Sequence, residues 1–284
     1  MLQPMKFVRP TLAVVERNKI PLSRDAETEA SDFFSGAVID EDNHFNGIEA
    51  TWMVPKPYAN GDDDKYYSAA WIGLDGFNSS DDGSDDVLQA GTEQDVQDSN
   101  TRDSYVWFGW LPADPLKITN FPVSPGDTVS CSVGTFIDDN KKTKGAFSIY
   151  NWNTQLMTYV TFDKPNDVTF KGDSAEWIME DTSDDGNHMA QFGAITFRSC
   201  SASGDSTKDL SDATLLDIYT DSDDDDSDDD DSDHSDLVCE AVKESNAVLV
   251  ISNPKDLDAK FITATTSTIV SFFSLLANVL NLFI

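Results

Sequence analysis

The chain has 284 residues and a formal net charge of −33, with 52 acidic residues against 19 Lys and Arg. That length allows one large all-β domain or two small ones, and 17 Phe with 6 Trp can fill a sizeable core. The acidic excess would repel phosphate polyanions, which excludes nucleic acids as partners. A chain poor in Lys and Arg also avoids the positive self-repulsion that unfolds ordinary proteins in acid. High solubility is the simpler interpretation, and composition alone does not decide between the two.

Residues 1–30 contain one short apolar run, TLAVV at 11–15. This run is too short for the hydrophobic region of a signal peptide, and no small-residue cleavage site follows it. We interpret residues 1–30 as a poorly ordered leader or the remnant of a pro-segment.

Residues 31–203 have the pattern of a β-protein throughout. Short apolar or alternating runs such as GIEATWMV, SAAWIGL and SYVWFGWL are separated by turn sequences such as ANGDDD and VSPGD. About nine or more such runs without a helical period predict a β-sandwich of two antiparallel sheets.

The segment 204–260 contains the tract DSDDDDSDDDDSDHSD at 221–236, which holds 11 acidic residues. A tract of this composition cannot bury a core, so we expect 204–260 to be an acidic, largely disordered linker. No Gly or closing Glu stands in the tract at the spacing of an EF-hand calcium site.

The C-terminal segment 261–284 carries no charged residue over 24 positions. It is long enough to span the hydrocarbon core of a bilayer. Behind a polar spacer and the small residues SNA at 245–247 it also fits a lipid-anchor signal. An amphipathic end that does not enter a membrane is the alternative.

The stretch SAEWIMED at 174–181 carries two glutamates on what we expect to be one strand. In a strand Glu176, Ile178 and Glu180 share one face, while Trp177 and Met179 point to the other. The two glutamates are then about 13 Å apart, whereas a glycosidase needs its carboxyl pair at about 5–9.5 Å. The pair therefore fails as a glycosidase site, and one glutamate must work with a partner on another strand or not work at all.

Five successive segments carry a family resemblance: FNGIEATWMVP, AAWIGLDG, VLQAGTEQ, AEWIMED and FGAITF. In order and spacing they resemble the glutamic peptidases called eqolisins, which are acid-acting fungal endopeptidases with a concanavalin A-like β-sandwich. The resemblance implies a secreted, extracellular or cell-surface enzyme that hydrolyses protein or peptide substrates. It implies neither a cofactor nor a metal, and we expect a monomer.

Carried over position by position, the resemblance implies catalytic roles for Gln89 and Glu180 and leaves Glu176 as a bystander. Positions that line the family's substrate cleft match a further set of residues here: Trp71, Asp75, Gly76, Gly91, Trp107 and Phe34.

A carboxyl and an amide suit peptide hydrolysis in acid. One carboxyl with an ordinary pKa of about 4.3 can take a proton from water and later return it to the leaving amine. A neutral amide donates to the developing oxyanion through its NH₂ and accepts from the attacking water through its carbonyl. We therefore expect Gln89 and Glu180 to meet across adjoining strands of one hollow.

The sequence departs from the family at several positions. Phe34 stands where the family has Trp, Leu111 where it has a cleft Tyr, and Ser183 where it has an acidic residue; a Cys near GLDG is missing. These changes keep a non-catalytic, lectin-like binding module on the same fold as the alternative function. A glycosidase remains open only if another strand supplies an acid about 5–9 Å from Glu180.

The remaining residues with metal or thiol chemistry form no recognisable motif. His44, His188 and His234 lie far apart without ligand spacing, so we expect no metal site. The three cysteines are too few and odd in number for a disulfide-built scaffold, and the sequence leaves their pairing open.

Overall fold

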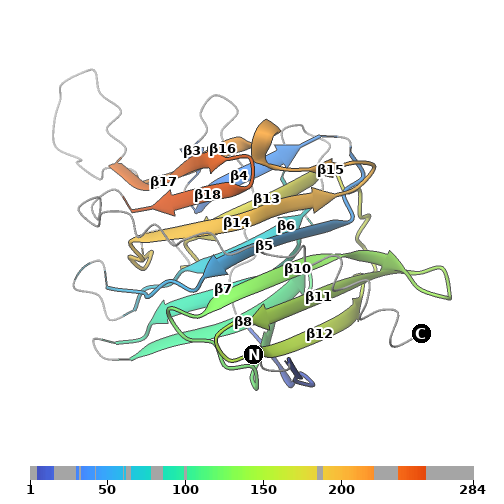
Figure 1. Ribbon diagram of the computed structural model, residues 1–284, viewed down its shortest axis with the longest axis horizontal. Coiled ribbons are helices and arrows are strands. Elements are labelled where there is room, and N and C mark those ends of the chain that lie inside the picture. Colours follow the sequence, from blue (N-terminus) through green and yellow to red (C-terminus); the bar gives the residue numbers. More distant parts are fainter. Residues whose placement is uncertain are drawn as a thin grey trace.

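The computed structural model describes residues 5–15, 30–31, 33–41, 43–59, 61, 65–77, 86–98, 101–183, 188–220 and 236–253. Within these ranges the chain is almost entirely β, with one short 3-10 helix, η1 (Leu210–Asp212). The strands form two packed, mainly antiparallel layers (Figure 1). The predicted β-sandwich is confirmed.

The first layer has the strand order β1–β12–β11–β10–β5–β14–β18–β17. In that order the strands are β1 (Lys6–Phe7), β12 (Leu156–Asp163), β11 (Thr143–Asn151), β10 (Thr128–Ile137), β5 (Gly47–Met53), β14 (Ala194–Ser203), β18 (Val248–Ser252) and β17 (Asp236–Ser245). A two-residue strand, β15 (Thr207–Lys208), forms a hairpin with the end of β14.

The second layer has the order β2–β9–β8–β7–β6–β13–β4–β16. Its strands are β2 (Leu12–Val14), β9 (Leu116–Ile118), β8 (Arg102–Trp110), β7 (Leu88–Val96), β6 (Ala69–Leu74), β13 (Ser174–Glu180), β4 (Phe34–Asp40) and β16 (Thr214–Thr220). The short β3 (Ala30–Ser31) runs parallel to β16, and β16 also pairs with β17, which joins the two layers at one edge.

The main hydrophobic core fills the space between the layers. Alternate residues of each strand point into it, as the period of two predicts. Phe108 of the second layer stacks on Phe147 of the first, with ring centroids 5.2 Å apart, and Trp52 packs against Phe197. Cys131, Cys200 and Cys239 are buried in this core as free thiols.

The second layer is also apolar on its outer face. A separate cluster of ten buried side chains covers it: Phe34, Val38, Ala69, Trp71, Phe77, Val87, Trp107, Leu111, Ile178 and Leu216. We call this the outer cluster. Because apolar groups lie on both of its faces, β13 is buried at every position from Ser174 to Glu180.

The predicted end of the sandwich at residue 203 is wrong. The segment expected as a disordered linker contributes β16, β17 and β18, which complete one edge of both layers. Leu216, Ile218, Leu249 and Ile251 from these strands are fully buried. The rest of that predicted linker, 221–235 and 254–260, lies outside the described residues, as does the predicted membrane tail 261–284.

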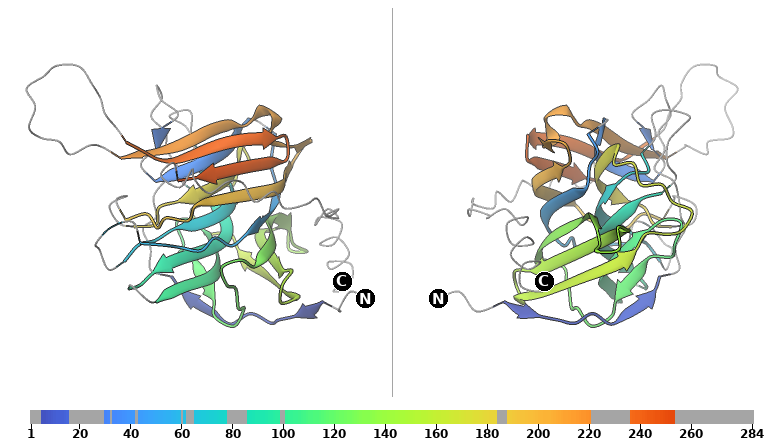
Figure 2. Two further views of the ribbon diagram at one scale, coloured as in Figure 1. Left: turned by 60° about the vertical axis from the view of Figure 1, so that its left-hand side comes forward. Right: turned by 90° about the vertical axis from the view of Figure 1, so that its right-hand side faces the viewer.

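The N-terminal segment is also more regular than the sequence indicated. β2 pairs with β9 and β1 pairs with β12, so residues 5–15 run along the outermost strand of each layer (Figure 2). Pairing of this kind covers backbone groups that an edge strand would otherwise leave open. The expectation of a poorly ordered leader is wrong for these residues, whereas an origin as a pro-segment stays a prediction.

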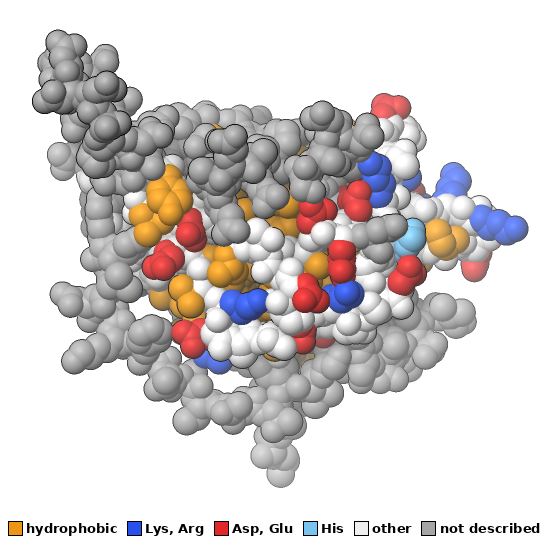
Figure 3. Space-filling model, turned by 90° about the horizontal axis from the view of Figure 1, so that it is seen from above, with side chains coloured by type: hydrophobic (Ala, Val, Ile, Leu, Met, Phe, Trp, Pro, Cys, Tyr) orange, Lys and Arg blue, Asp and Glu red, His pale blue; other side chains and the backbone are white. Residues whose placement is uncertain are grey.

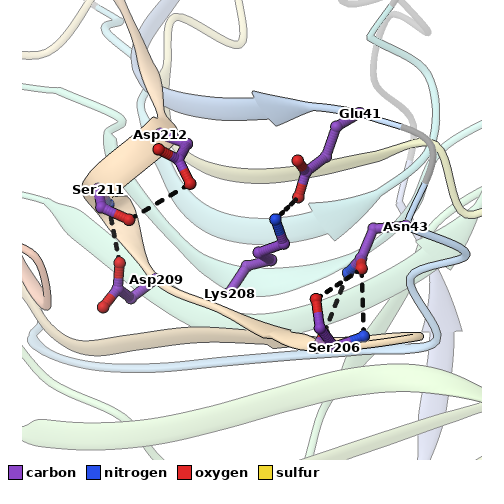
Figure 4. A network of polar contacts seen from close by, with 7 residues as sticks. All are labelled: Glu41, Asn43, Ser206, Lys208, Asp209, Ser211 and Asp212. Carbon is purple, nitrogen blue, oxygen red and sulfur yellow. Dashed lines mark hydrogen bonds and ion pairs between the residues drawn. The ribbon is translucent and has the colours of Figure 1, made fainter.

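A polar network fixes the turn after β4 against the β15 hairpin (Figure 4). Lys208 forms an ion pair with Glu41 at 2.6 Å. Asn43 exchanges hydrogen bonds with Ser206, and the side chain of Asp209 caps the first turn of η1. The network ties the chain that enters β16 to the end of β4, its neighbour in the sheet.

On the face shown in Figure 3, acidic and basic side chains lie interspersed among apolar ones. The excess of negative charge is therefore not gathered into a single patch on the described part of that face. Among the described residues, no helix is long and apolar enough to cross a membrane.

We predict that a chain ending at residue 203 does not fold cooperatively. The truncation removes β16 from beside β4 and β18 from beside β14, together with the buried side chains that β16–β18 contribute to the core. A chain ending at residue 253 keeps every described strand and is the matched control. Denaturant unfolding followed by Trp fluorescence should give a sigmoidal transition for the control alone; a cooperative transition in the shorter chain would contradict the prediction.

Candidate active site

The central strand of the second layer, β13, carries the candidate glutamates. Trp177 and Met179 point into the main core. Ile178 belongs to the outer cluster, so Glu176 and Glu180, which lie two positions to either side, face the outer side of the layer as the strand period predicts. Both are buried, with 0% and 5% of their surface exposed.

The strand register brings Gln89 and Glu180 to the same face of the same layer. Gln89 on β7 lies opposite Gly73 on β6, and Glu180 on β13 lies opposite Ala69 on β6. The expectation that the two candidates lie on adjoining strands is therefore wrong, because β6 lies between them. They are also offset by four residues along that strand.

The indole of Trp71 connects these two positions. Its Nε1–H donates to Oε2 of Glu180 at 2.8 Å. At its other end, Cζ3 lies 2.7 Å from the point where a Cβ at Gly73 would stand, which is the residue opposite Gln89. One ring thus reaches from the carboxylate of Glu180 to the row that contains Gln89.

Small residues and a ring contact hold Trp71 in this position. A Cβ at Gly91 would lie 2.6 Å from the Cβ of Trp71 and 2.1 Å from the carbonyl oxygen of Ala70. Only glycine therefore fits at position 91 without displacing the strand or the indole. Phe34, opposite Glu180 on β4, packs edge-on against Trp71 with ring centroids 6.4 Å apart.

The other predicted cleft residues lie in or next to the outer cluster. Trp107 lies opposite Gly91 on β8 and is fully buried, and Leu111 follows β8 in the same cluster. Gly76 has a φ of +92°, which glycine adopts without strain. The structure thus brings Trp71, Gly91, Trp107 and Phe34 to the face of the layer that also carries the two candidate catalytic residues.

Asp75 lies beneath a loop. It is fully buried, and its carboxylate accepts hydrogen bonds from the backbone N–H groups of Lys171, Gly172 and Asp173 at 2.6–3.0 Å. These contacts fix the chain that enters β13. Burial outweighs them and, with the nearby charge of Asp173, raises the pKa of Asp75 from 3.8 to about 7.

Sequence reasoning missed Glu93. This residue lies on β7 opposite Ala69, in the row of Glu180, and Thr182 donates a hydrogen bond to its Oε1. The sequence could have indicated Glu93 as a site residue, because residues 89, 91 and 93 share a face in any strand. Within the described part of the chain, no three His, Cys, Asp or Glu side chains are arranged to hold a metal ion.

The protein should become less stable as the pH rises from about 4 to about 7. Between its unfolded and folded pKa values, Asp75 binds more protons in the folded state, so unfolding becomes easier with rising pH over that window. Across this window, the ionisation of Asp75 lowers the free energy of unfolding by up to about 4 kcal/mol. The variant Asp75→Asn has no proton to lose at this position. Its free energy of unfolding, measured with denaturant at several pH values, should therefore fall less steeply with rising pH than that of the wild type.

The exposed Asp167 provides the control, since Asp167→Asn should keep the wild-type slope. Equal slopes in wild type and Asp75→Asn would show that Asp75 does not titrate in this window.

Three comparisons with known proteins bear on the family to which the chain belongs. The model of the Peptidase A4 family matches residues 32–240. Aspergillopepsin-2 from Aspergillus niger is 32% identical over 162 residues, which are 56% of this chain and 54% of that protein. The match thus spans about half the length of this curated relative.

The similar solved structures include two with the same overall fold. A scytalido-glutamic peptidase with a transition-state analogue inhibitor has a TM-score of 0.60 at 19% identity, covering 78% of this chain and 98% of that one. SCP-B, a member of the eqolisin family in complex with the tripeptide Ala-Ile-His, has a TM-score of 0.55 at 21% identity and the same coverage. On the family match and this shared fold, the chain belongs to the Peptidase A4 (eqolisin) family.

Proposed function

We propose that the protein is an acid endopeptidase in which Glu180 and Gln89 carry out peptide hydrolysis. The observation that supports this most directly is the hydrogen bond from Trp71 to Glu180, which orients one carboxyl group on the face that also carries Gln89. The family assignment supports the reaction class.

In the proposed reaction, the carboxylate of Glu180 takes a proton from water as the water oxygen bonds to the scissile carbonyl carbon. The NH₂ group of Gln89 donates to the oxygen that becomes negatively charged. The protonated Glu180 then returns the proton to the amide nitrogen, the C–N bond breaks, and a carboxylic acid and an amine leave. Because β6 separates the two residues, the scissile group would lie over the indole of Trp71 between them.

The fold suits an acidic medium. Asp75 lies close to the site and is neutral only below a pH of about 7. A protein that gains stability as its buried carboxyls take up protons is expected to work where such protons are available. Proteins or peptides are the proposed substrates, and we propose that the enzyme acts outside the cell; the monomeric state and the membrane tail stay predictions.

The comparisons give no support to the lectin-like alternative. The glycosidase alternative required a second acid near Glu180, and Glu93 lies in its row two strands away, about 10 Å between backbones. Its carboxylate is engaged by Thr182, and the family match concerns peptidases. We therefore retain peptide hydrolysis as the single proposed function.

Cleavage of an acid-denatured protein should be measured between about pH 2 and 5 with the wild type and two site variants. Glu180→Gln removes the proton-transferring group and should lower kcat/KM by at least about a thousandfold. Gln89→Ala removes the oxyanion donor and should lower kcat by about a hundredfold or more.

Glu244→Gln, an exposed position on β17, is the control for removal of one carboxylate and should leave activity unchanged. Proteolysis that survives both site substitutions at wild-type rates would rule out the assigned pair.

A further inference from the structure

The second glutamate of β13, Glu176, has no place in the mechanism above, yet its surroundings are unusual. Its side chain is fully buried, and neither carboxyl oxygen has a hydrogen-bond partner among the described residues. A buried polar group in this state costs free energy, and native structures rarely contain one without a reason. The carboxyl of Glu176 is therefore a candidate for a contact that forms in the working enzyme.

The groups around Glu176 favour its neutral form. The nearby charges come from Asp75 after β6, Asp40 at the end of β4 and Asp173 just before β13 itself, and all three groups are acidic. The nearby hydroxyl of Ser174 is the one group that favours the ionised form, and it forms no hydrogen bond with Glu176 in the structure. Burial first, and then these charges, raise the pKa of Glu176 well above its ordinary value. A neutral carboxyl carries one O–H donor, which an ionised one lacks.

The carboxyl of Glu176 leans across β6 toward β7. Glu176 lies opposite Gly73, and its Oε2 is 3.1 Å from the point where a Cβ at Gly73 would stand. On the other side of Gly73, in the same row, lies Gln89. Glu176 and Gln89 therefore lie on either side of β6, about 10 Å apart between backbones, and Gly73 between them has no side chain of its own to separate the carboxyl from the amide.

The other neighbour of Gln89 offers no competing polar group in that row. Gly109 lies opposite Gln89 on β8, and the space above it is filled by Pro115, which lies 3.2–3.5 Å from the point where a Cβ at Gly109 would stand. With glycines on both sides, the first polar side chain that Gln89 meets along its row is Glu176.

We propose that the neutral carboxyl of Glu176 is a positioning group that donates its O–H to the amide oxygen of Gln89. This rests on the proposed function of Gln89. An amide has two chemically different ends, and only its NH₂ end stabilises an oxyanion. A donor on its oxygen fixes which end points away from Glu176 and toward the substrate. An ionised carboxylate would instead attract the NH₂ group and turn the amide oxygen toward the substrate.

The carboxyl oxygens of Glu176 form no hydrogen bond with a described residue in the structure, so the bond to Gln89 is one that the proposal adds. Hydrogen bonds of catalytic groups are often long before substrate binds and tighten in the complex.

Two substitutions separate positioning from simple packing. Glu176→Gln keeps the size of the side chain and a donor for the amide oxygen of Gln89, so kcat should stay within about threefold of wild type. Glu176→Met keeps approximate size but has no donor, so kcat should fall about tenfold, while KM changes less than about twofold, as expected for one lost orienting hydrogen bond. Equal kcat values for the two variants would overturn the proposal.

NMR provides a readout that does not depend on activity. The ¹³Cδ resonance of Glu176 should keep the position of a protonated acid across the pH range in which an ordinary carboxyl titrates. With a non-cleavable peptide bound, the side-chain NH₂ resonances of Gln89 should be similar in wild type and Glu176→Gln and displaced in Glu176→Met. A Glu176 resonance that titrates in the ordinary range of a carboxyl would also overturn the proposal. This measurement uses the wild type alone, so it does not depend on whether the variants fold.

The same data distinguish the two proposals. If the wild type cleaves no protein substrate but the NMR results are as expected, the proposed function fails and the contact between Glu176 and Gln89 stands. If the wild type cleaves substrate and Glu180→Gln abolishes cleavage, but Glu176→Met equals Glu176→Gln, only the positioning role fails.

Discussion

The structure depends on the burial of both faces of β13. One face of this strand supplies Trp177 and Met179 to the core between the layers, and the other carries Glu176, Ile178 and Glu180 under the outer cluster. A strand in the middle of a layer has partners on both sides, so its backbone polar groups are paired, but its side chains have no access to bulk water unless a cleft opens. Two carboxyl groups are thereby held in a medium of low polarity. Each must then be neutral, hydrogen-bonded, or both.

The structure uses these options differently at three buried acids. Glu180 accepts from the indole of Trp71. Asp75 accepts from three backbone N–H groups, yet its pKa is still raised to about 7 because burial dominates. Glu176 is fully buried and lies near other acids, and burial first and then these charges favour a protonated carboxyl. The acidity of the composition therefore has a counterpart in the interior: acid protonates buried groups whose charged forms are unfavourable, and so it stabilises the fold.

Period-two alternation identified the strands, the shared face of Glu176 and Glu180, and the core positions, because all of these are local properties of a strand. The alternation could not predict which distant segments pair with one another. β16 pairs with β4, from which it is separated by most of the chain, and the neighbouring Asp tract made the flanking strands resemble a disordered segment. The order β7–β6–β13 could not be derived either, so Gln89 and Glu180 were expected on adjoining strands. Residues 5–15 form strands only because the edges of β9 and β12 accept them.

The candidate site is shaped as much by glycines as by its functional groups. Gly91 leaves room for the indole of Trp71 to lie close to the sheet, and Gly73 leaves room for both that indole and the carboxyl of Glu176. Gly109 admits Pro115 on the far side of Gln89. A side chain at any of these three positions would occupy space within 3.3 Å of its neighbours, where a Cβ is rarely accommodated. The absence of side chains along one row therefore determines which polar groups can reach Gln89, and it makes a carboxyl from two strands away the one best placed to orient it.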